Sequence, residues 1–365
     1  MDGTQPTDLA ARLLAWYASH RRDLPWRRTK DAYYVWVAEV MLQQTQVATV
    51  VPYYERFLAR FFSVEALAAA SLDEVLKLWE GLGYYARARH LHAAARKVVA
   101  EHGGQVPPTM EGLLSLPGVG RYTAGAILSI AYGRDVPALD GNVRRVLSRV
   151  LAIEEDVTRG AGQRRLWTLA EELLPPGRAG DFNQALMDLG ATVCTPRAPQ
   201  CSQCPLAFEC QAHRLGQQER FPIRRQRAPL PHYQVAAGVI WNGERRFLIA
   251  QRPLDGMLGG LWEFPGGKCE AEETLQDCLR RELMEELDVE VVVGDLLTVV
   301  RHAYTHFRIT LHAFHCRIVA GQIRALGCAD WRWISLDDVS RFAFSAADHQ
   351  IIAALRALGG PPEAG

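Results

Sequence analysis

Apolar residues recur every three or four positions along the first 215 residues of the chain. The spacing is regular from Leu9 to Tyr17 and again from Val35 to Val51, which is the period of an amphipathic helix. Glycine and proline interrupt the pattern near residues 81–83, 103–108, 117–120 and 175–180, where we expect short turns between helices. Residues 1–215 are therefore predicted to form an all-α domain.

The apolar period changes to two after Tyr233. Strands are predicted at residues 235–240, 247–250, 290–293 and 309–314, with one charged helix at 274–287. Residues 216–232 are basic and carry several prolines, which is typical of an interdomain linker. The pattern thus predicts a second, α+β domain over residues 233–358, and the glycine- and proline-rich residues 359–365 are predicted to be a flexible tail.

Composition and charge narrow the class of protein. The chain has 365 residues, of which 48% are hydrophobic and 22% charged, and this excludes disordered, collagen-like and disulfide-scaffold proteins. No apolar run reaches the roughly 18 residues that a membrane helix needs, and Met1 to Asp8 lack the order of a secretory signal, so we expect a cytoplasmic protein without membrane contact. Residues 1–230 carry five more cationic than anionic side chains and residues 231–365 five fewer, which weakly favours a polyanionic partner for the first half.

Four of the eight cysteines crowd into residues 194–210. Six, two and five residues separate the successive members Cys194, Cys201, Cys204 and Cys210. Ligation by sulfur alone suits a [4Fe–4S] cluster or zinc, and the wide gaps favour the cluster over the paired knuckles of a structural zinc site. The other four cysteines have no ligand spacing and are interpreted as ordinary thiols.

A second motif is the turn Leu116–Pro117–Gly118–Val119–Gly120 between two predicted helices. Gly118 and Gly120 allow a tight turn whose backbone N–H groups, with the next helix N-terminus, can bind a DNA phosphate without sequence preference. A plain helix connection is the alternative. The residues after the turn favour the phosphate interpretation, because a helix opens at Arg121 and Asp140–Gly141–Asn142 comes about twenty residues later.

The hairpin, the later aspartate and the cysteine loop together resemble the helix-hairpin-helix DNA glycosylases of the endonuclease III superfamily. The MutY-type adenine DNA glycosylases are most similar, on the segments Val-Trp-Val-Ala-Glu-Val-Met-Leu-Gln-Gln-Thr-Gln-Val at 35–47, Arg-Asp-Leu-Pro-Trp at 22–26 and Gly-Leu-Gly-Tyr-Tyr at 81–85. The resemblance spans nearly the whole chain. It implies a helix-hairpin-helix glycosylase domain with a [4Fe–4S] loop, followed by a Nudix-like domain.

Two carboxylates are the candidate catalytic groups. Base excision needs an acid that protonates the departing purine and an ionised carboxylate that faces the sugar cation, which is the logic of glycoside hydrolysis. Glu39 lies in an apolar run that should raise its pKa, and the resemblance makes it the acid and Asp140 the group that stabilises or traps the cation. A solvated helix glutamate and a helix N-cap are the alternatives. The resemblance further implies that Asn142 holds Asp140 and a water, and that Tyr122, which unlike lysine cannot form an imine, makes the enzyme monofunctional.

The resemblance also implies two sets of binding residues. The adenine pocket would be lined by Arg22, Trp26, Leu42, Val47 and Asp188. A second set would fill the gap in the duplex or contact the opposite base. Its members are Gln44, Thr45, Leu82 and Tyr84, of which Tyr84 would insert into the base stack as a wedge. For the apolar members of the first set, ordinary core packing is an equally weighted alternative.

The second half carries a near-complete Nudix box. Five residues separate Gly267 from Glu273, and seven more separate Glu273 from the run Arg-Glu-Leu-Met-Glu-Glu that begins at Arg281. Asp288 stands where the pattern has a glycine. Glu282, Glu285 and Glu286 would lie on one helix face and could bind Mg²⁺. In MutY-type proteins this domain typically recognises 8-oxoguanine after losing the box. The box is thus either a relic or a second hydrolase, and a left-handed aspartate at 288 would exclude neither.

The family's 8-oxoguanine-reading loop corresponds to residues 302–307. Thr305 and His306 keep the hydroxyl and imidazole of that loop, and Tyr304 replaces its phenylalanine. The sequence therefore predicts a monomeric, cytoplasmic, nucleoid-associated glycosylase that removes adenine opposite 8-oxoguanine or guanine in duplex DNA. The rival hypotheses are a pyrimidine glycosylase/lyase, a nucleotide pyrophosphatase and a non-catalytic iron–sulfur DNA-binding protein.

Overall fold

The structure is a computed structural model that describes residues 6–223 and 229–358. The chain divides into two compact units, Met1–Ala69 with His90–Arg227 and Ala70–Arg89 with Ala228–Gly365. Segment 70–89 thus belongs with the second unit, although it lies within the predicted helical domain. Its helix α5 (Leu72–Trp79) and the loop after that helix make hydrogen bonds to residues 251, 342 and 344, and Arg89, at the end of the segment, donates to the carbonyl of residue 259.

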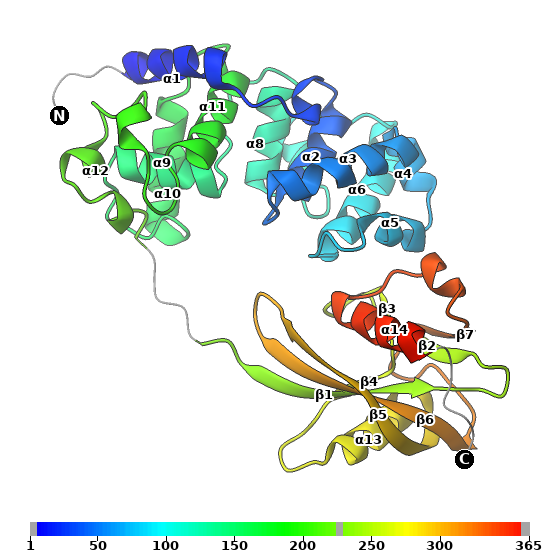
Figure 1. Ribbon diagram of the computed structural model, residues 1–365. Coiled ribbons are helices and arrows are strands. Elements are labelled where there is room, and N and C mark those ends of the chain that lie inside the picture. Colours follow the sequence, from blue (N-terminus) through cyan, green and yellow to red (C-terminus); the bar gives the residue numbers. More distant parts are fainter. Residues whose placement is uncertain (1–5, 224–228, 359–365) are drawn as a thin grey trace. The chain divides into compact units, whose positions relative to one another are not determined.

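The first unit is entirely helical (Figure 1). Its helices are α1 (Pro6–His20), α2 (Ala32–Leu42), α3 (Val47–Arg60), α4 (Val64–Ala69), α6 (Ala86–His102, which begins in segment 70–89), α7 (Met110–Leu114), α8 (Arg121–Ile130), α9 (Gly141–Val150), α10 (Gly160–Glu172), α11 (Ala179–Thr192) and α12 (Gln211–Arg214). Short 3₁₀ turns lie at Pro25–Arg27, Cys201–Gln203 and Gln218–Arg220.

Helix α2 is a central, almost fully buried helix. Its N-cap Asp31 accepts hydrogen bonds from the N–H groups of Tyr33 and Tyr34, and the residues after the cap are nearly all apolar. Eight of its eleven positions are buried, and Glu39 is the one carboxyl among them. The apolar sequence thus takes an acidic side chain into the interior of the unit.

Helix α9 positions a second group of side chains. Asp140 caps its N-terminus, and its apolar face of Val143, Val146 and Leu147 packs in one core cluster with residues of α11. Helices α7 and α8 form the predicted hairpin. At its turn Gly118 has a φ of +75°, and a Cβ atom there would lie 2.6 Å from the Cβ of His90, so both the backbone and the space demand glycine.

The second unit contains two sheets. The elements are α5, β1 (His232–Ile240), β2 (Phe247–Gln251), β3 (Trp262–Glu263), β4 (Gly266–Lys268), α13 (Leu275–Leu287), β5 (Val289–Ala303), β6 (Arg308–Gly321), β7 (Asp330–Ile334), a 3₁₀ turn (Asp338–Arg341) and α14 (Ala346–Leu358). The four-stranded sheet has the order β4-β1-β6-β5, in which β1 and β6 are parallel, and the three-stranded sheet has the order β3-β2-β7. Figure 1 shows α13 and α14 on opposite sides of the larger sheet.

The predicted fold class is confirmed, because an all-α part precedes an α+β part. The four predicted strands and the predicted helix appear as β1, β2, β5, β6 and α13, whereas β3, β4, β7 and α14 were not predicted. Part of the predicted linker, 216–223, includes Phe221, which is buried against Cys210 and Ala212. Residues 224–228 of that linker and the predicted tail lie outside the described residues.

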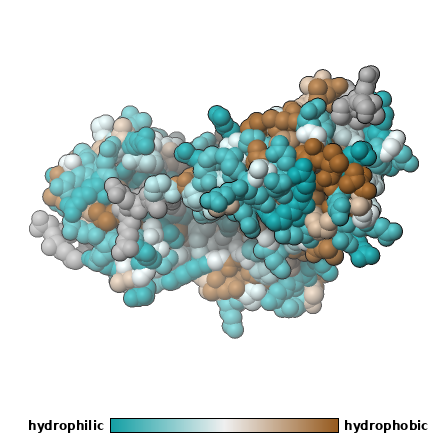
Figure 2. Space-filling view, turned by 90° about the horizontal axis from the view of Figure 1, so that it is seen from below, coloured by the Kyte–Doolittle hydropathy of each residue, from teal (hydrophilic) through white to brown (hydrophobic). Residues whose placement is uncertain are grey.

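The outer surface is mostly polar. Hydrophilic residues cover most of the face seen in Figure 2, and apolar residues appear there as separate patches. Among the described helices, none is both long enough and apolar enough to cross a membrane.

Candidate active site

Glu39 and Tyr122 meet in the interior of the first unit. Glu39 comes from α2 and is only 4% exposed, and Tyr122 comes from the first turn of α8, directly after the hairpin. The Tyr122 hydroxyl donates a hydrogen bond to the Glu39 carboxylate. Burial raises the pKa of Glu39 to about 7, against the opposing effect of that hydrogen bond. A carboxyl of this kind is partly protonated at neutral pH, which suits a general acid.

Asp140 presents its carboxylate to the same region. As N-cap of α9 it accepts the Val143 N–H at 2.7 Å, and its other oxygen accepts the Asn142 amide at 2.9 Å. Burial raises the pKa of Asp140, and the hydrogen bonds from Val143 and Asn142 oppose that rise because they favour the ionised form. The Asp140 side chain is therefore both the N-cap of α9 and the candidate catalytic carboxylate. One oxygen makes the cap and the other is held by Asn142.

Arg145 holds this group in place. Its guanidinium donates to the Asn142 side-chain oxygen at 2.8 Å and to the backbone carbonyls of Gly190 and Cys194 at 2.7 and 2.8 Å. The orientation of Asn142 is thus tied to the end of α11 and to the start of the cysteine loop.

A cavity of about 720 Å³ joins these side chains. It is lined by all four predicted catalytic residues, Glu39, Tyr122, Asp140 and Asn142, by four of the five predicted adenine-pocket residues, Arg22, Trp26, Leu42 and Val47, and by the predicted opposite-base residues Gln44 and Thr45. The volume is typical of a ligand pocket. Residues that are far apart in the chain therefore face one space, and their individual roles stay predictions.

Asp188, the fifth predicted pocket residue, is not among those that line the cavity. Its side chain is fully buried and accepts hydrogen bonds from Arg22 Nε at 2.7 Å and from both terminal nitrogens of Arg27. It therefore lies behind the wall and orients two arginines that do line the cavity. The Asp188 carboxylate is therefore paired with arginines of the wall and is not exposed to the cavity.

The sequence analysis assigned no site role to six polar residues of the cavity wall, namely Arg27, Gln43, Gln46, Arg144, Arg145 and Gln184. Gln184 lies on α11 one helical turn before Asp188, so both residues lie on the same face of the helix. Because the helical period places the two on one face, only the packing of the arginines over Asp188 shows that Gln184, and not Asp188, lines the cavity.

The other predicted opposite-base residues belong to the second unit. Leu82 is buried, whereas Tyr84 is 38% exposed and follows Gly83 in a turn with positive φ at both positions. Residues 304–307 form the turn between β5 and β6, where Tyr304 packs on Phe307 and the side chains of Thr305 and His306 are exposed. The hairpin glycines Gly118 and Gly120 remain in the first unit, at the start of α8.

The four clustered cysteines line one small apolar cavity between α9, α11 and the loop after α11. All eight cysteines of the chain are free thiols. Buried Arg149, near the end of α9, donates to Cys194 Sγ at 3.4 Å and to the carbonyls of Thr195, Pro196 and Gln218 at 2.6, 3.0 and 2.7 Å. Across residues 6–223 and 229–358 no three His, Cys, Asp or Glu side chains are grouped tightly enough for a single metal ion. Four thiols around one cavity nevertheless fit the donor set of an iron–sulfur cluster, which is larger than one ion.

The Nudix-box glutamates are arranged differently. Arg281 pairs with Glu273 at 2.9 Å, with Glu282 at 3.0 Å and with Glu285 at 3.3 Å, while Glu286 accepts the Gly266 N–H. Asp288 ends α13 with a φ of +59°, so the left-handed conformation expected of the missing glycine is confirmed. One Arg281 guanidinium is thus shared by three carboxylates, and Glu286 is the candidate Mg²⁺ ligand that Arg281 does not contact. Binding of Mg²⁺ by the box stays a prediction.

Comparisons with known proteins agree with this architecture. The family profile described as "HhH-GPD superfamily base excision DNA repair protein" matches residues 37–172, and the profile described as "NUDIX domain" matches residues 236–354. The human protein named "Adenine DNA glycosylase" is 39% identical over 95% of this chain and 73% of its own length.

Solved structures are similar to the first half of the chain. A thermostable thymine-DNA glycosylase superposes with a TM-score of 0.53 at 32% identity, covering 57% of this chain and 97% of its own. A trapped endonuclease III–DNA covalent intermediate superposes with a TM-score of 0.51 at 21% identity, covering 57% of this chain and 96% of its own, which shows a shared fold.

Proposed function

This chain belongs to the adenine DNA glycosylases, a family of base-excision repair enzymes, and on that premise we propose that it removes adenine paired with 8-oxoguanine or guanine in duplex DNA. The bond broken is the N-glycosidic bond, and the strand is left uncut. The observation that carries the proposal is that two carboxyl groups, buried Glu39 and half-buried Asp140, line one cavity of the first unit.

The adenine must leave the base stack to reach these groups, because a stacked base exposes neither its N7 nor its sugar carbon. Trp26, Leu42 and Val47 supply apolar walls that would hold the extruded base, and Arg22, Arg27 and Gln184 supply polar contacts. The same apolar walls exclude water and thereby sustain the raised pKa of Glu39.

The chemistry follows from the protonation states of the two carboxyls. Protonated Glu39 donates its proton to adenine N7, the glycosidic electron pair leaves with the base, and a cation forms at the sugar. Asp140 stabilises that cation or bonds to it transiently. Glu39, now ionised, takes a proton from a water held near Asn142 as the water oxygen bonds to the sugar carbon. The abasic product, free adenine and the starting enzyme balance the reaction.

The identity of residue 122 accounts for the strand being left uncut. A lysine at this place would attack the sugar and form an imine that leads to strand cleavage, whereas a phenol forms no imine. The hydroxyl of Tyr122 instead donates to Glu39 and favours its ionised form after the proton has been given away.

We also propose that Cys194, Cys201, Cys204 and Cys210 hold a [4Fe–4S] cluster, on the basis of their spacing, their common cavity and their thiol donor set. When bound, the cluster would cross-link residues 194–210 through iron–thiolate bonds. The loop fixed in this way would have a structural role in positioning residues that contact DNA. We propose that the enzyme works as a monomer. Since the proposed substrate is genomic DNA, we also propose that it acts at the nucleoid, in the cytoplasm.

The test is single-turnover release of adenine from a duplex that carries adenine opposite 8-oxoguanine, measured with and without alkali. Asp140→Asn should lower the rate by ~100-fold or more, because asparagine keeps the helix cap but loses the charge. Asp31→Asn is the matched control, since Asp31 caps α2 outside the cavity. Strand scission without alkali, or equal rates for both variants, would refute the proposal.

A further inference from the structure

Only half of one face of the larger sheet is covered. Helix α13 packs on Ala236, Ile240, Phe314 and Cys316 in the second halves of β1 and β6. Side chains alternate along a strand, so the same face continues into the first halves of those strands. There it presents polar residues in place of apolar ones, namely His232 and Gln234 on β1 and Arg308, Thr310 and His312 on β6.

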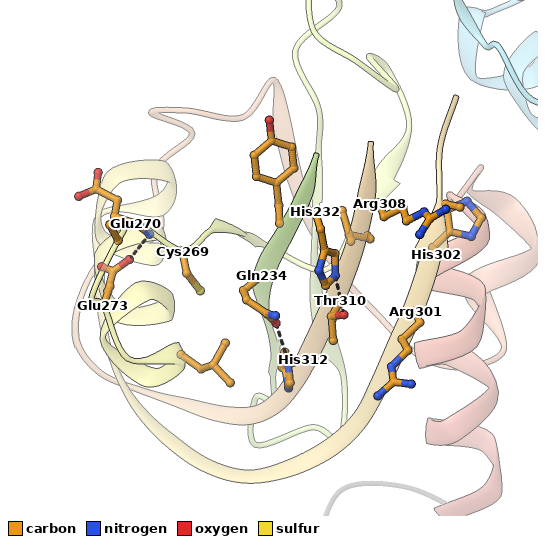
Figure 3. A pocket seen from close by; sticks show the side chains of 15 residues that line it. His232, Gln234, Cys269, Glu270, Glu273, Arg301, His302, Arg308, Thr310 and His312 are labelled. Carbon is orange, nitrogen blue, oxygen red and sulfur yellow. Dashed lines mark hydrogen bonds between the residues drawn. The ribbon is translucent and has the colours of Figure 1, made fainter. Parts of the chain in front are cut away.

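This uncovered half forms the floor of a groove of about 870 Å³ in the second unit (Figure 3). Its side chains are ordered by cross-strand hydrogen bonds, His232 to Thr310 at 2.9 Å and His312 to Gln234 at 3.1 Å. The loop between β4 and α13 makes the far wall. A hydrogen-bonded polar floor of this kind would gain little from the apolar side chains of a protein partner.

The charge of the groove is cationic on the sheet side. Arg301 and Arg308 both line it, both are exposed, and neither forms an ion pair with any described residue. Figure 3 shows Arg301 and Arg308 on the two strands that border the β5–β6 turn. On the far wall Glu273 is paired with Arg281, which lowers its pKa to about 2, so Glu270 is the remaining acidic side chain without a cationic partner there.

We propose that this groove binds the phosphodiester backbone of the DNA strand that carries the base opposite the adenine. The inference rests on the proposed function and deepens it. Arg301 lies three residues before Tyr304 and Arg308 one residue after Phe307, so the two arginines flank in sequence the turn whose exposed Thr305 is the candidate reader of the opposite base. A strand whose base reaches Thr305 would bring a flanking phosphate toward these strands.

Guanidinium groups suit this role because they contact phosphate oxygens with two hydrogen bonds and never lose their charge. Such contacts hold the strand in register and have no base preference. The groove would thus position the duplex for the turn, while the turn itself reads the base. Arg301 and Arg308 are in this sense positioning residues.

The test compares the salt dependence of DNA binding by the full-length protein. The probe is a duplex with 8-oxoguanine opposite 2′-fluoro-deoxyadenosine, whose fluorine prevents cleavage by destabilising the sugar cation. Replacing both arginines, Arg301→Ala with Arg308→Ala, should reduce the slope of log Kd against log salt by about 1.8, since each lost phosphate contact removes about 0.9. Arg317→Ala is the matched control, because Arg317 is exposed on β6 and does not line the groove.

A double Arg→Lys variant keeps the charges and should keep most of the slope, which separates charge loss from misfolding. A slope unchanged in the double alanine variant, with adenine still excised by the wild type, overturns the groove and leaves the proposed function standing. A reduced slope in a protein that never excises adenine supports the groove and refutes the proposed function.

Discussion

The hydroxyl of Tyr84 lies 2.7 Å from the side-chain oxygen of Thr305, although 221 positions separate the two residues in the chain. Both belong to the second unit. Tyr84 has a φ of +49° after Gly83 at +76°, and the Arg87 guanidinium packs on its ring at 5.3 Å. The candidate wedge and the candidate reader of the opposite base therefore form one hydrogen-bonded pair.

If the pair reads the opposite base together, its two members should not act independently. We expect Tyr84→Phe and Thr305→Val each to lower the ratio of excision rates opposite 8-oxoguanine and guanine by about 5- to 10-fold. A change of that size corresponds to the loss of one hydrogen bond. The double variant should lose no more than either single variant, as a double-mutant cycle on excision rates would show. Thr305→Ser should retain the preference, and fully additive losses would contradict the pairing.

The raised pKa of Glu39 predicts a specific pH profile. Glu39 must be protonated to act as the acid, so the single-turnover rate should be high below pH 7 and fall about tenfold per pH unit above a pKa of about 7. Tyr122→Phe removes the hydrogen bond that favours ionised Glu39, which should raise that pKa and move the alkaline limb to higher pH. A limb that moves to lower pH would show that the phenol does not act on Glu39.

Arg149 should determine the stability of the cysteine loop. Arg149→Lys loses most of its hydrogen bonds to Cys194, Thr195, Pro196 and Gln218, which should cost about 2–4 kcal/mol and lower the bound metal per chain. Thermal unfolding and elemental analysis measure both effects, and the latter distinguishes iron from zinc. Arg159→Lys, at an exposed ion pair with Asp156, is the control and should change neither.

The Nudix box should have no part in adenine excision. Arg281 holds Glu282 and Glu285 in ion pairs that a bound Mg²⁺ would have to break, so we expect no Mg²⁺-dependent release of pyrophosphate from deoxynucleoside triphosphates. Glu286→Gln should excise adenine within about twofold of the wild-type rate, because Glu286 is not among the residues that line the cavity of Glu39 and Asp140. Pyrophosphate release by the wild type that disappears in Glu286→Gln would instead establish a second activity.

Much of the fold and of the site was determined by the sequence alone. The change of apolar period from 3.6 to 2 near Tyr233 predicted the order of the two architectures, because the period follows directly from helix and strand geometry. The apolar run around Glu39 predicted a buried carboxyl, whereas Asp140 was singled out by the family resemblance, with a helix N-cap as the alternative; the structure shows the cap. Short elements such as β3 and β4 have too few residues to show a period and escaped prediction.

Only the tertiary structure decided the relationships that depend on packing between distant segments. Asp188 and Gln184 differ by one helical turn, and only the burial of α11 shows that the first faces two arginines and the second the cavity. Three further features also depend on packing between distant segments. They are the membership of residues 70–89 in the second unit, the contact of Tyr84 with Thr305 and the uncovered half of the sheet. Contacts between distant segments depend on how whole elements dock, and the local pattern of a single chain does not contain that information.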